Sequence, residues 1–192
     1  MSVKKLAIMF GLAVFVAASS CVWAQNDPLG KTDTVTLKVT PVGTSQWMVS
    51  MVVWNDEPLA AVDIPIRYTA GMAKLVVDSV SFKGTRMEAF AQKYGPVDTA
   101  NQMMHVGGLA YMGPDKPPLA PGDGEMARVY ISMKDEKKPA PFAIDTTTMA
   151  PNSSLMLVDA NAKIIIPVLK IATAGAGKEV KKDEKKTPPK KK

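Results

Sequence analysis

The stretch from Trp47 to Phe82 constrains the fold of this chain more than any other part. It contains three runs of branched and aromatic residues, separated by two turn-forming breaks. Runs of this composition that are bounded by Asn, Asp, Pro or Gly are typical of β-strands. Because each strand must bury one face against another layer, three strands in succession predict a sheet that packs on a second layer.

The alternation of side chains predicts which faces are buried. The segment 34–39 alternates strictly between polar and apolar residues, so its apolar set should point inward: Val35, Leu37 and Val39. In the segment 47–54 one face is entirely apolar, and we assign this face to the core: Trp47, Val49, Met51 and Val53. Trp54 is then expected on the opposite face or at the strand end.

Further strand patterns follow along the chain, at 62–68, 74–82, 102–112, 126–133, 155–158 and 164–171. No ten-residue helical pattern separates them, which argues against parallel βαβ units. The sequence therefore predicts an all-β fold, an antiparallel jelly-roll sandwich of about nine strands.

Three local features of this pattern predict further details of the fold. Pro65 should lie at a sheet edge or bulge, because it cannot donate to a ladder. The pair Gly107-Gly108 suggests a bulge. The spacing of Met87, Phe90 and Tyr94 indicates a short helical turn or a structured loop.

Residues 1–24 have the pattern of a secretory signal peptide. Lys4 and Lys5 precede the apolar segment 6–18, and Val22-Trp23-Ala24 supplies small residues at the cleavage positions before Gln25. Because the segment 18–21 resembles a lipobox, acylation of Cys21 stays open as an alternative to simple cleavage. Either route predicts export to the periplasm or the cell exterior, with residues 25–31 as a polar lead-in.

Residues 174–192 read as a flexible Lys-rich tail. The segment 178–192 holds eight lysines against three acids and has one apolar residue, Val180, so it cannot bury enough surface to fold. We expect it to be disordered and to interact with anionic envelope surfaces, although a solvated tail without a role is an equal alternative.

The charge of the folded body excludes a nucleic-acid-binding domain. The net charge is +6, of which the leader contributes +2 and the tail +5, so subtraction leaves about −1 for residues between them. Such a body has no surplus of cations from which to build a basic face. The single cysteine lies at position 21 and the single histidine at 105, which excludes disulfides, thiolate metal sites and multi-histidine sites in the body.

The order of four segments resembles a cohesin-type module of exported bacterial proteins. These segments are VVWNDEPLAAVDIPIRY, LVVDSVSFKGTR, PPLAPGDGEMARVYISM and LMLVDANAKIIIPVLKIA, and the resemblance covers residues 32–173. It implies a nine-stranded jelly-roll sandwich that binds another protein without catalysis. The usual partners of cohesins are calcium-loaded dockerin modules, whereas this sequence shows neither a second module nor a dockerin segment.

The inventory of reactive residues predicts that the protein is not an enzyme. Any Ser-His-Asp triad would have to use His105, and the serines do not lie in a nucleophile elbow. No cofactor is expected, because Asp and Asn in turns have a structural reason to be there. Calcium stays open as the less favoured alternative, through hard oxygen ligands in turns: Asn55, Asp56 and Glu57, or Asp115 and Asp123.

Taken with the export signal, these features predict a monomeric, non-catalytic module for protein–protein recognition or assembly at the cell envelope. The partner would be a dockerin-like or another envelope protein. The alternative is a carbohydrate-binding module that recognises a polysaccharide through exposed aromatic rings. The candidate ligand contacts are Trp54, Tyr68, Tyr94, Tyr111 and Tyr130.

Overall fold

The computed structural model describes residues 30–110, 116–134, 141–151 and 153–173. The predicted signal peptide and Lys-rich tail lie outside these ranges, as do Tyr111 and Asp115. Within them the chain forms twelve strands and no helix, and hence no helix long and apolar enough to cross a membrane.

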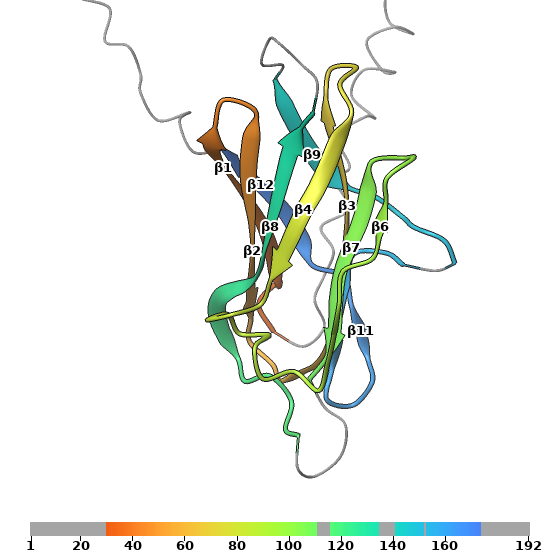
Figure 1. Ribbon diagram of the computed structural model, residues 1–192. Coiled ribbons are helices and arrows are strands. Elements are labelled where there is room, and N and C mark those ends of the chain that lie inside the picture. The colour runs from red at the N-terminus through yellow and green to blue at the C-terminus, as the bar shows by residue number, and fades with distance from the viewer. Residues whose placement is uncertain (1–29, 111–115, 135–140, 152, 174–192) are drawn as a thin grey trace, which may run out of the picture.

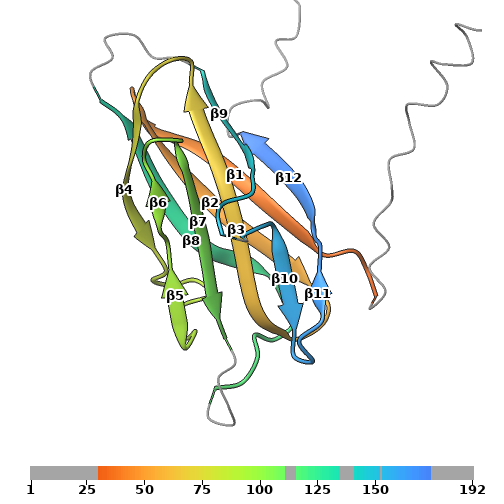
Figure 2. The same cartoon turned by 90° about the vertical axis from the view of Figure 1, so that its right-hand side faces the viewer.

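The strands form two sheets that face each other (Figures 1 and 2). The five-stranded sheet has the order β12 (Val168–Thr173), β1 (Thr34–Gly43), β2 (Gln46–Asn55), β8 (Gly122–Met133) and β4 (Leu75–Ser81). The seven-stranded sheet has the order β11 (Ile164–Ile165), β10 (Met156–Asp159), β3 (Leu59–Ala70), β7 (Met103–Leu109) and β5 (Gln92–Tyr94), with β6 (Val97–Asp98) beside β7 and β9 (Phe142–Thr146) beside β3.

The predicted all-β sandwich is therefore confirmed. The strand count exceeds the expected nine for three reasons. β5 and β6 are only three and two residues long, the predicted run 164–171 is divided between β11 and β12, and β9 was not predicted. The pairing is antiparallel except between β1 and β12, which run parallel from Thr34 beside Val168 to Val39 beside Thr173. This edge pair is the one departure from the predicted antiparallel pairing among the described strands.

The core lies between the sheets and contains the side chains that alternation assigned to it. The inward sets of β1 and β2 are all buried: Val35, Leu37, Val39, Trp47, Val49, Met51 and Val53. The seven-stranded sheet supplies the opposing layer: Val62, Ile64, Ile66, Tyr68, Met104 and Val106. Fully burying one such aliphatic side chain contributes about 1.5–3 kcal/mol, so this double layer is the main source of stability.

Pro65 lies in the middle of the central strand β3, so the expected edge or bulge position was wrong. On one side β3 pairs with β7 from Ala61 to Arg67, whereas on the other it pairs first with β10, up to Asp63, and then with β9, from Ile66. Pro65 stands at the junction between those two partners, where its carbonyl oxygen accepts a bond from the Thr146 hydroxyl. A residue without an N–H is tolerated there because the ladder is interrupted at Pro65 on the side of β10 and β9.

The bulge expected at Gly107-Gly108 was also wrong. The register of β3 with β7 is continuous across both glycines. They are needed instead for close packing, because a Cβ at Gly107 would lie 2.5 Å from the Tyr94 ring and one at Gly108 would lie 2.5 Å from the Gln92 carbonyl oxygen.

The segment between β4 and β5 is a structured loop, one of the two forms that its spacing allowed. Met87 and Phe90 are buried in the core, whereas Tyr94 belongs to β5 and is exposed. Arg86 fastens the loop to the five-stranded sheet: its guanidinium donates to the carbonyl oxygens of Val53 at 3.0 Å and Gly122 at 2.9 Å.

Candidate functional site

The outward face of the seven-stranded sheet, called here the outer face, is made by residues that alternate with the core. On β3 the outward residues are Asp63, Pro65 and Arg67. Their register partners on β7 are, in the same order, Gly107, His105 and Met103. The same register continues to the apolar side chains that border the face: Leu109 of β7, Met156 and Val158 of β10, and Ile164 of β11.

Three polar side chains meet at the centre of the outer face. The Ser153 hydroxyl donates to Oδ2 of Asp63 at 2.8 Å and lies 2.9 Å from Nδ1 of His105. The same nitrogen is 3.2 Å from Oδ1 of Asp63. Burial raises the pKa of the Asp63 carboxyl, and the contacts with Ser153 and His105 oppose this effect only in part.

This cluster does not have the geometry of a catalytic triad. In a triad the acid and the nucleophile bind opposite nitrogens of the histidine, so that the ring can pass a proton between them. Here Asp63 and Ser153 both lie at Nδ1, and the serine hydroxyl donates directly to the carboxylate. The arrangement gives Oδ2 of Asp63 and Nδ1 of His105 a hydrogen-bonding partner in Ser153 and fixes the ring of His105 on the surface. The buried Oδ1 of Asp63 receives no hydrogen bond from the described residues.

The sequence identified His105 but missed its two partners. Asp63 and Ser153 are 90 residues apart, and they meet only because β3 lies between β7 and the segment that leads into β10. No spacing in the sequence signals such a meeting. Tyr94 lies beside this polar cluster, and its ring centroid is 5.2 Å from that of His105.

The five predicted contact aromatics do not form one platform. Tyr68 is 0% exposed between the sheets, so its assignment as a ligand contact was wrong, because the inward alternation of β3 carries its ring into the core. Tyr94 is exposed on the seven-stranded sheet, whereas Trp54 and Tyr130 are half-buried on the outward side of the five-stranded sheet. Tyr111 lies outside the described residues.

Trp54 and Tyr130 are also far apart on their own sheet. Tyr130 pairs with Met48, which is six residues from Trp54 along β2. At about 3.3 Å per residue, this places the backbones of the two residues on the order of 20 Å apart. They therefore present no adjacent pair of rings, and their role as contacts stays a prediction.

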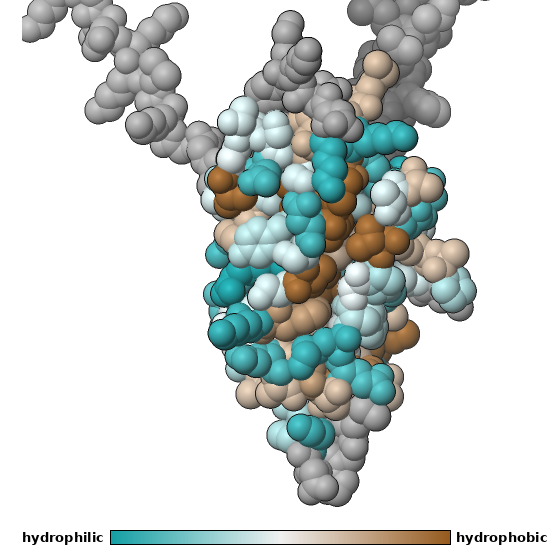
Figure 3. Space-filling view, in the orientation of Figure 1, coloured by the Kyte–Doolittle hydropathy of each residue, from teal (hydrophilic) through white to brown (hydrophobic). Residues whose placement is uncertain are grey.

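The outward side of the five-stranded sheet is predominantly polar. Glu125 accepts a hydrogen bond from the Ser50 hydroxyl and forms an ion pair with Arg128. Beside this network, β1 presents a row of Thr34, Thr36, Lys38 and Thr40. Figure 3 shows a separate apolar area of the surface around β4 and β6. In these strands Val97 is exposed, and Val77 and Val80 are only partly buried.

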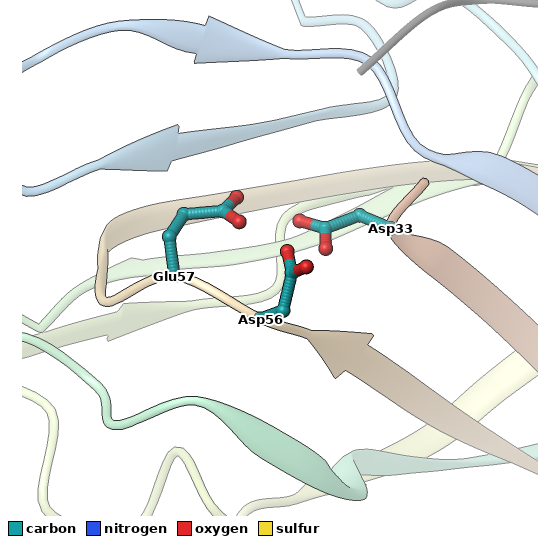
Figure 4. Close-up of side chains that lie close together, drawn as sticks. All are labelled: Asp33, Asp56 and Glu57. Atoms are coloured by element: carbon teal, nitrogen blue, oxygen red, sulfur yellow. The ribbon is translucent and has the colours of Figure 1, made fainter. Parts of the chain in front are cut away.

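A second cluster of charged side chains lies at one end of the five-stranded sheet. Asp33 immediately precedes β1, and Asp56 and Glu57 form the turn between β2 and β3. Because Thr34 pairs with Trp54, the start of β1 lies beside the end of β2. Figure 4 shows the three carboxylates pointing toward one another, and one oxygen from each lies within 4.8 Å of the other two.

The members of this carboxylate cluster differ in exposure. Asp33 is 0% exposed, Glu57 is half-buried and Asp56 is exposed. Hydrogen bonding with the Glu57 side chain, and the backbone N–H of Lys31 at 2.7 Å, hold the pKa of Asp56 below its usual value, so this carboxyl is ionised at neutral pH. The sequence named Asp56 and Glu57 as possible calcium ligands and missed Asp33. Asp123, from the other predicted set, is not part of the cluster.

Comparison with protein-family models and with curated protein sequences gives no match. Comparison with solved structures gives matches at the level of the fold, and these include several cohesin modules. The resemblance seen in the sequence is therefore confirmed at the level of the fold.

Three of these structures illustrate the similarity. A type I cohesin–dockerin complex from Clostridium thermocellum, Coh-OlpA–Doc918, matches with a TM-score of 0.55 at 15% identity over 74% of this chain and 99% of that one. A second such complex from the same organism, Coh-OlpC–Doc435, has a TM-score of 0.56 at 12% identity, over 75% and 96%. The second type II cohesin of the ScaA scaffoldin of Acetivibrio cellulolyticus has a TM-score of 0.51 at 11% identity, over 74% and 95%.

Proposed function

We propose that this chain is a non-catalytic protein-binding module that recognises its partner through the outer face of the seven-stranded sheet. The observation that carries this proposal is the composition of that face. At its centre are three polar groups that are already bonded to one another, Asp63, His105 and Ser153. The apolar side chains around this centre are half-buried or exposed: Met103, Leu109, Met156, Val158 and Ile164.

Such a composition suits a protein interface for two reasons. The central part of an interface is depleted of free charges and enriched in aromatic residues and methionine, which adapts its shape to a partner. Because Asp63 is already 7% exposed and accepts the Ser153 hydrogen bond, a partner placed over it removes little further water from the carboxyl. By contrast, the threonines and Lys38 of the five-stranded sheet favour a hydrated surface.

The fold points to the class of partner to test first. Several of the cohesin modules that share this fold were crystallised in complex with dockerins, so a dockerin-type module is the natural candidate. The signal-peptide pattern of residues 1–24 supports an exported setting, and we place the module at the cell envelope.

The test compares two methionines on opposite sides of the sandwich. Met156→Glu places a charge in the outer face, and Met48→Glu places the same charge on the outward side of the other sheet; both residues are half-buried. Each variant is used to capture partners from an envelope fraction and to titrate a panel of purified dockerins by calorimetry. Circular dichroism confirms that both variants are folded.

We expect a protein partner to be retained by the wild type and by Met48→Glu but to bind Met156→Glu about tenfold more weakly or worse, because a buried unpaired carboxylate is costly at an interface. Equal weakening by both substitutions would contradict the choice of face. Recovery of polysaccharide without any protein would contradict the class of ligand.

A further inference from the structure

The carboxylate cluster has no part in the proposed interface, since it lies at the end of the other sheet. We propose that Asp33, Asp56 and Glu57 bind one calcium ion. Calcium binds oxygen ligands at 2.3–2.6 Å, so two oxygens on the same ion cannot be farther apart than about 5 Å. The three carboxylates meet this condition together, since one oxygen of each lies within 4.8 Å of the others.

A neighbouring amide provides a second, independent indication of a ligand. Asn55 is 1% exposed, and its Nδ2 donates to the backbone carbonyl oxygen of Glu57 at 2.6 Å. This bond fixes the amide inside the turn that carries Asp56 and Glu57. Its Oδ1 is buried and receives no hydrogen bond from the part of the chain that the structure describes. Buried acceptors without a donor are rare in proteins, and an amide oxygen is a normal calcium ligand.

The chemistry of the donors selects calcium among the common cations. All of them are hard oxygens, whereas zinc sites in proteins use histidine and cysteine. Magnesium binds at about 2.0–2.1 Å in near-ideal octahedral geometry, so it fits less well to a flexible turn with widely spaced oxygens. A divalent cation also offsets the negative charge that these carboxyl groups carry when all three are ionised, and one of them, Asp33, is completely buried.

The location of the cluster explains what the ion would do. The Asp33 carbonyl oxygen accepts a bond from the N–H of Val168 at the start of β12, and Asp56 follows the end of β2. An ion bound here joins three strand ends of the five-stranded sheet. Calcium should therefore stabilise the fold, by an amount that grows with its free concentration because only the folded chain assembles the ligands.

The experiment uses the purified protein without truncation and CaCl2 as the probe. Calorimetric titration should show one calcium ion bound per chain, and millimolar CaCl2 should raise Tm by roughly 5 °C relative to excess chelator. MgCl2 at the same ionic strength should give a clearly smaller shift.

The variants are chosen so that they fold. Asp56→Asn removes an exposed charge and Glu57→Gln keeps the shape of a half-buried side chain, so circular dichroism should be unchanged in both. Each should weaken calcium binding about tenfold or more. Asp145→Asn, which removes an exposed charge from β9, is the matched control and should bind calcium as the wild type does.

Three results would overturn the proposal: no calcium-dependent change in Tm of the wild type, unchanged calcium affinity in the folded Asp56→Asn and Glu57→Gln variants, or an equal response to magnesium. A loss of calcium binding in Asp123→Asn alone would place the ion at a different turn and would equally overturn this assignment.

Discussion

The ring of Tyr94 occupies the space in which a side chain at Gly107 would stand. A Cβ on Gly107 would lie 2.5 Å from Cε2 of Tyr94 and 2.6 Å from its hydroxyl oxygen. At the adjacent Gly108 the obstacle is different, because the nearest atom would be the backbone carbonyl oxygen of Gln92, at 2.5 Å. Gly107 therefore leaves space for a side chain that can rotate, whereas Gly108 leaves space for a backbone segment that cannot.

This difference predicts unequal costs for the same substitution. Gly108→Ala should lower the free energy of unfolding by about 2–3 kcal/mol, because overpacking must displace β5, whereas Gly107→Ala should cost about 1 kcal/mol through displacement of the Tyr94 ring. Urea denaturation followed by tryptophan fluorescence measures both. Gly43→Ala, whose Cβ would meet only the flexible Gln46 side chain at 3.1 Å, is the control. Equal costs at the two positions would contradict this account.

The fold was predictable from the sequence because strand alternation is a local property. Every side chain assigned to the inward faces of β1 and β2 is buried, since one polar/apolar period fixes a whole strand once one face meets a core. The glycine pair and Pro65 were misinterpreted for the opposite reason. The role of the glycines depends on the residues that pack beside β7, and the role of Pro65 depends on the position at which β3 changes its partner from β10 to β9. Both are contacts between segments that are distant in the sequence.

The same limit applies to the sites. Asp56 and Glu57 stood out because they are adjacent in a turn, but Asp33 joins them only through the register of β1 with β2. Ser153 reaches Asp63 across the sheet in the same way. Sequence reasoning finds the residues that one turn brings together, and it misses those that strand pairing brings together.

Tyr68 offers a test of a buried polar group. The residue is completely buried, and no described residue forms a hydrogen bond with its hydroxyl. Since an unsatisfied buried hydroxyl is unfavourable, Tyr68→Phe should leave the free energy of unfolding unchanged or raise it by about 1 kcal/mol. Denaturant titration of the two proteins measures the difference. A loss of more than about 1 kcal/mol would show that the hydroxyl has a partner.

Arg86 is predicted to be the most important arginine for stability among the described residues. Its side chain donates to the carbonyl oxygens of Val53, Ala120 and Gly122, which it joins to the loop before β5. Arg86→Ala should cost about 2–3 kcal/mol, because buried carbonyl groups lose a charged donor. Arg67→Ala is the matched control: Arg67 is exposed, and among the described residues its side chain donates a hydrogen bond only to the Met103 sulfur, so the substitution should cost less than about 0.5 kcal/mol. Similar losses in the two variants would contradict the role given to Arg86.

Asp63 should make the stability of this protein depend on pH in an unusual direction for a carboxylate. Burial raises its pKa in the folded state above the value of an unfolded aspartate, about 3.8. The folded state therefore holds the proton more tightly, so the stabilising contribution of this group is fully present below the unfolded pKa and is lost as pH rises through the folded pKa.

The neutral isostere isolates this effect. Asp63→Asn can still accept the Ser153 hydrogen bond but carries no charge, so it should be as stable as the wild type or more stable at neutral pH. Its advantage should shrink as the pH falls through the raised pKa of Asp63, because the wild-type carboxyl then becomes protonated and loses its charge. Asp63→Ala should instead lose about 1–3 kcal/mol across this range, because Ser153 and His105 lose their partner. Urea titrations at neutral, intermediate and acidic pH measure all three proteins. If the wild type gains stability over Asp63→Asn as the pH rises, the pKa of Asp63 is lowered in the folded state and not raised.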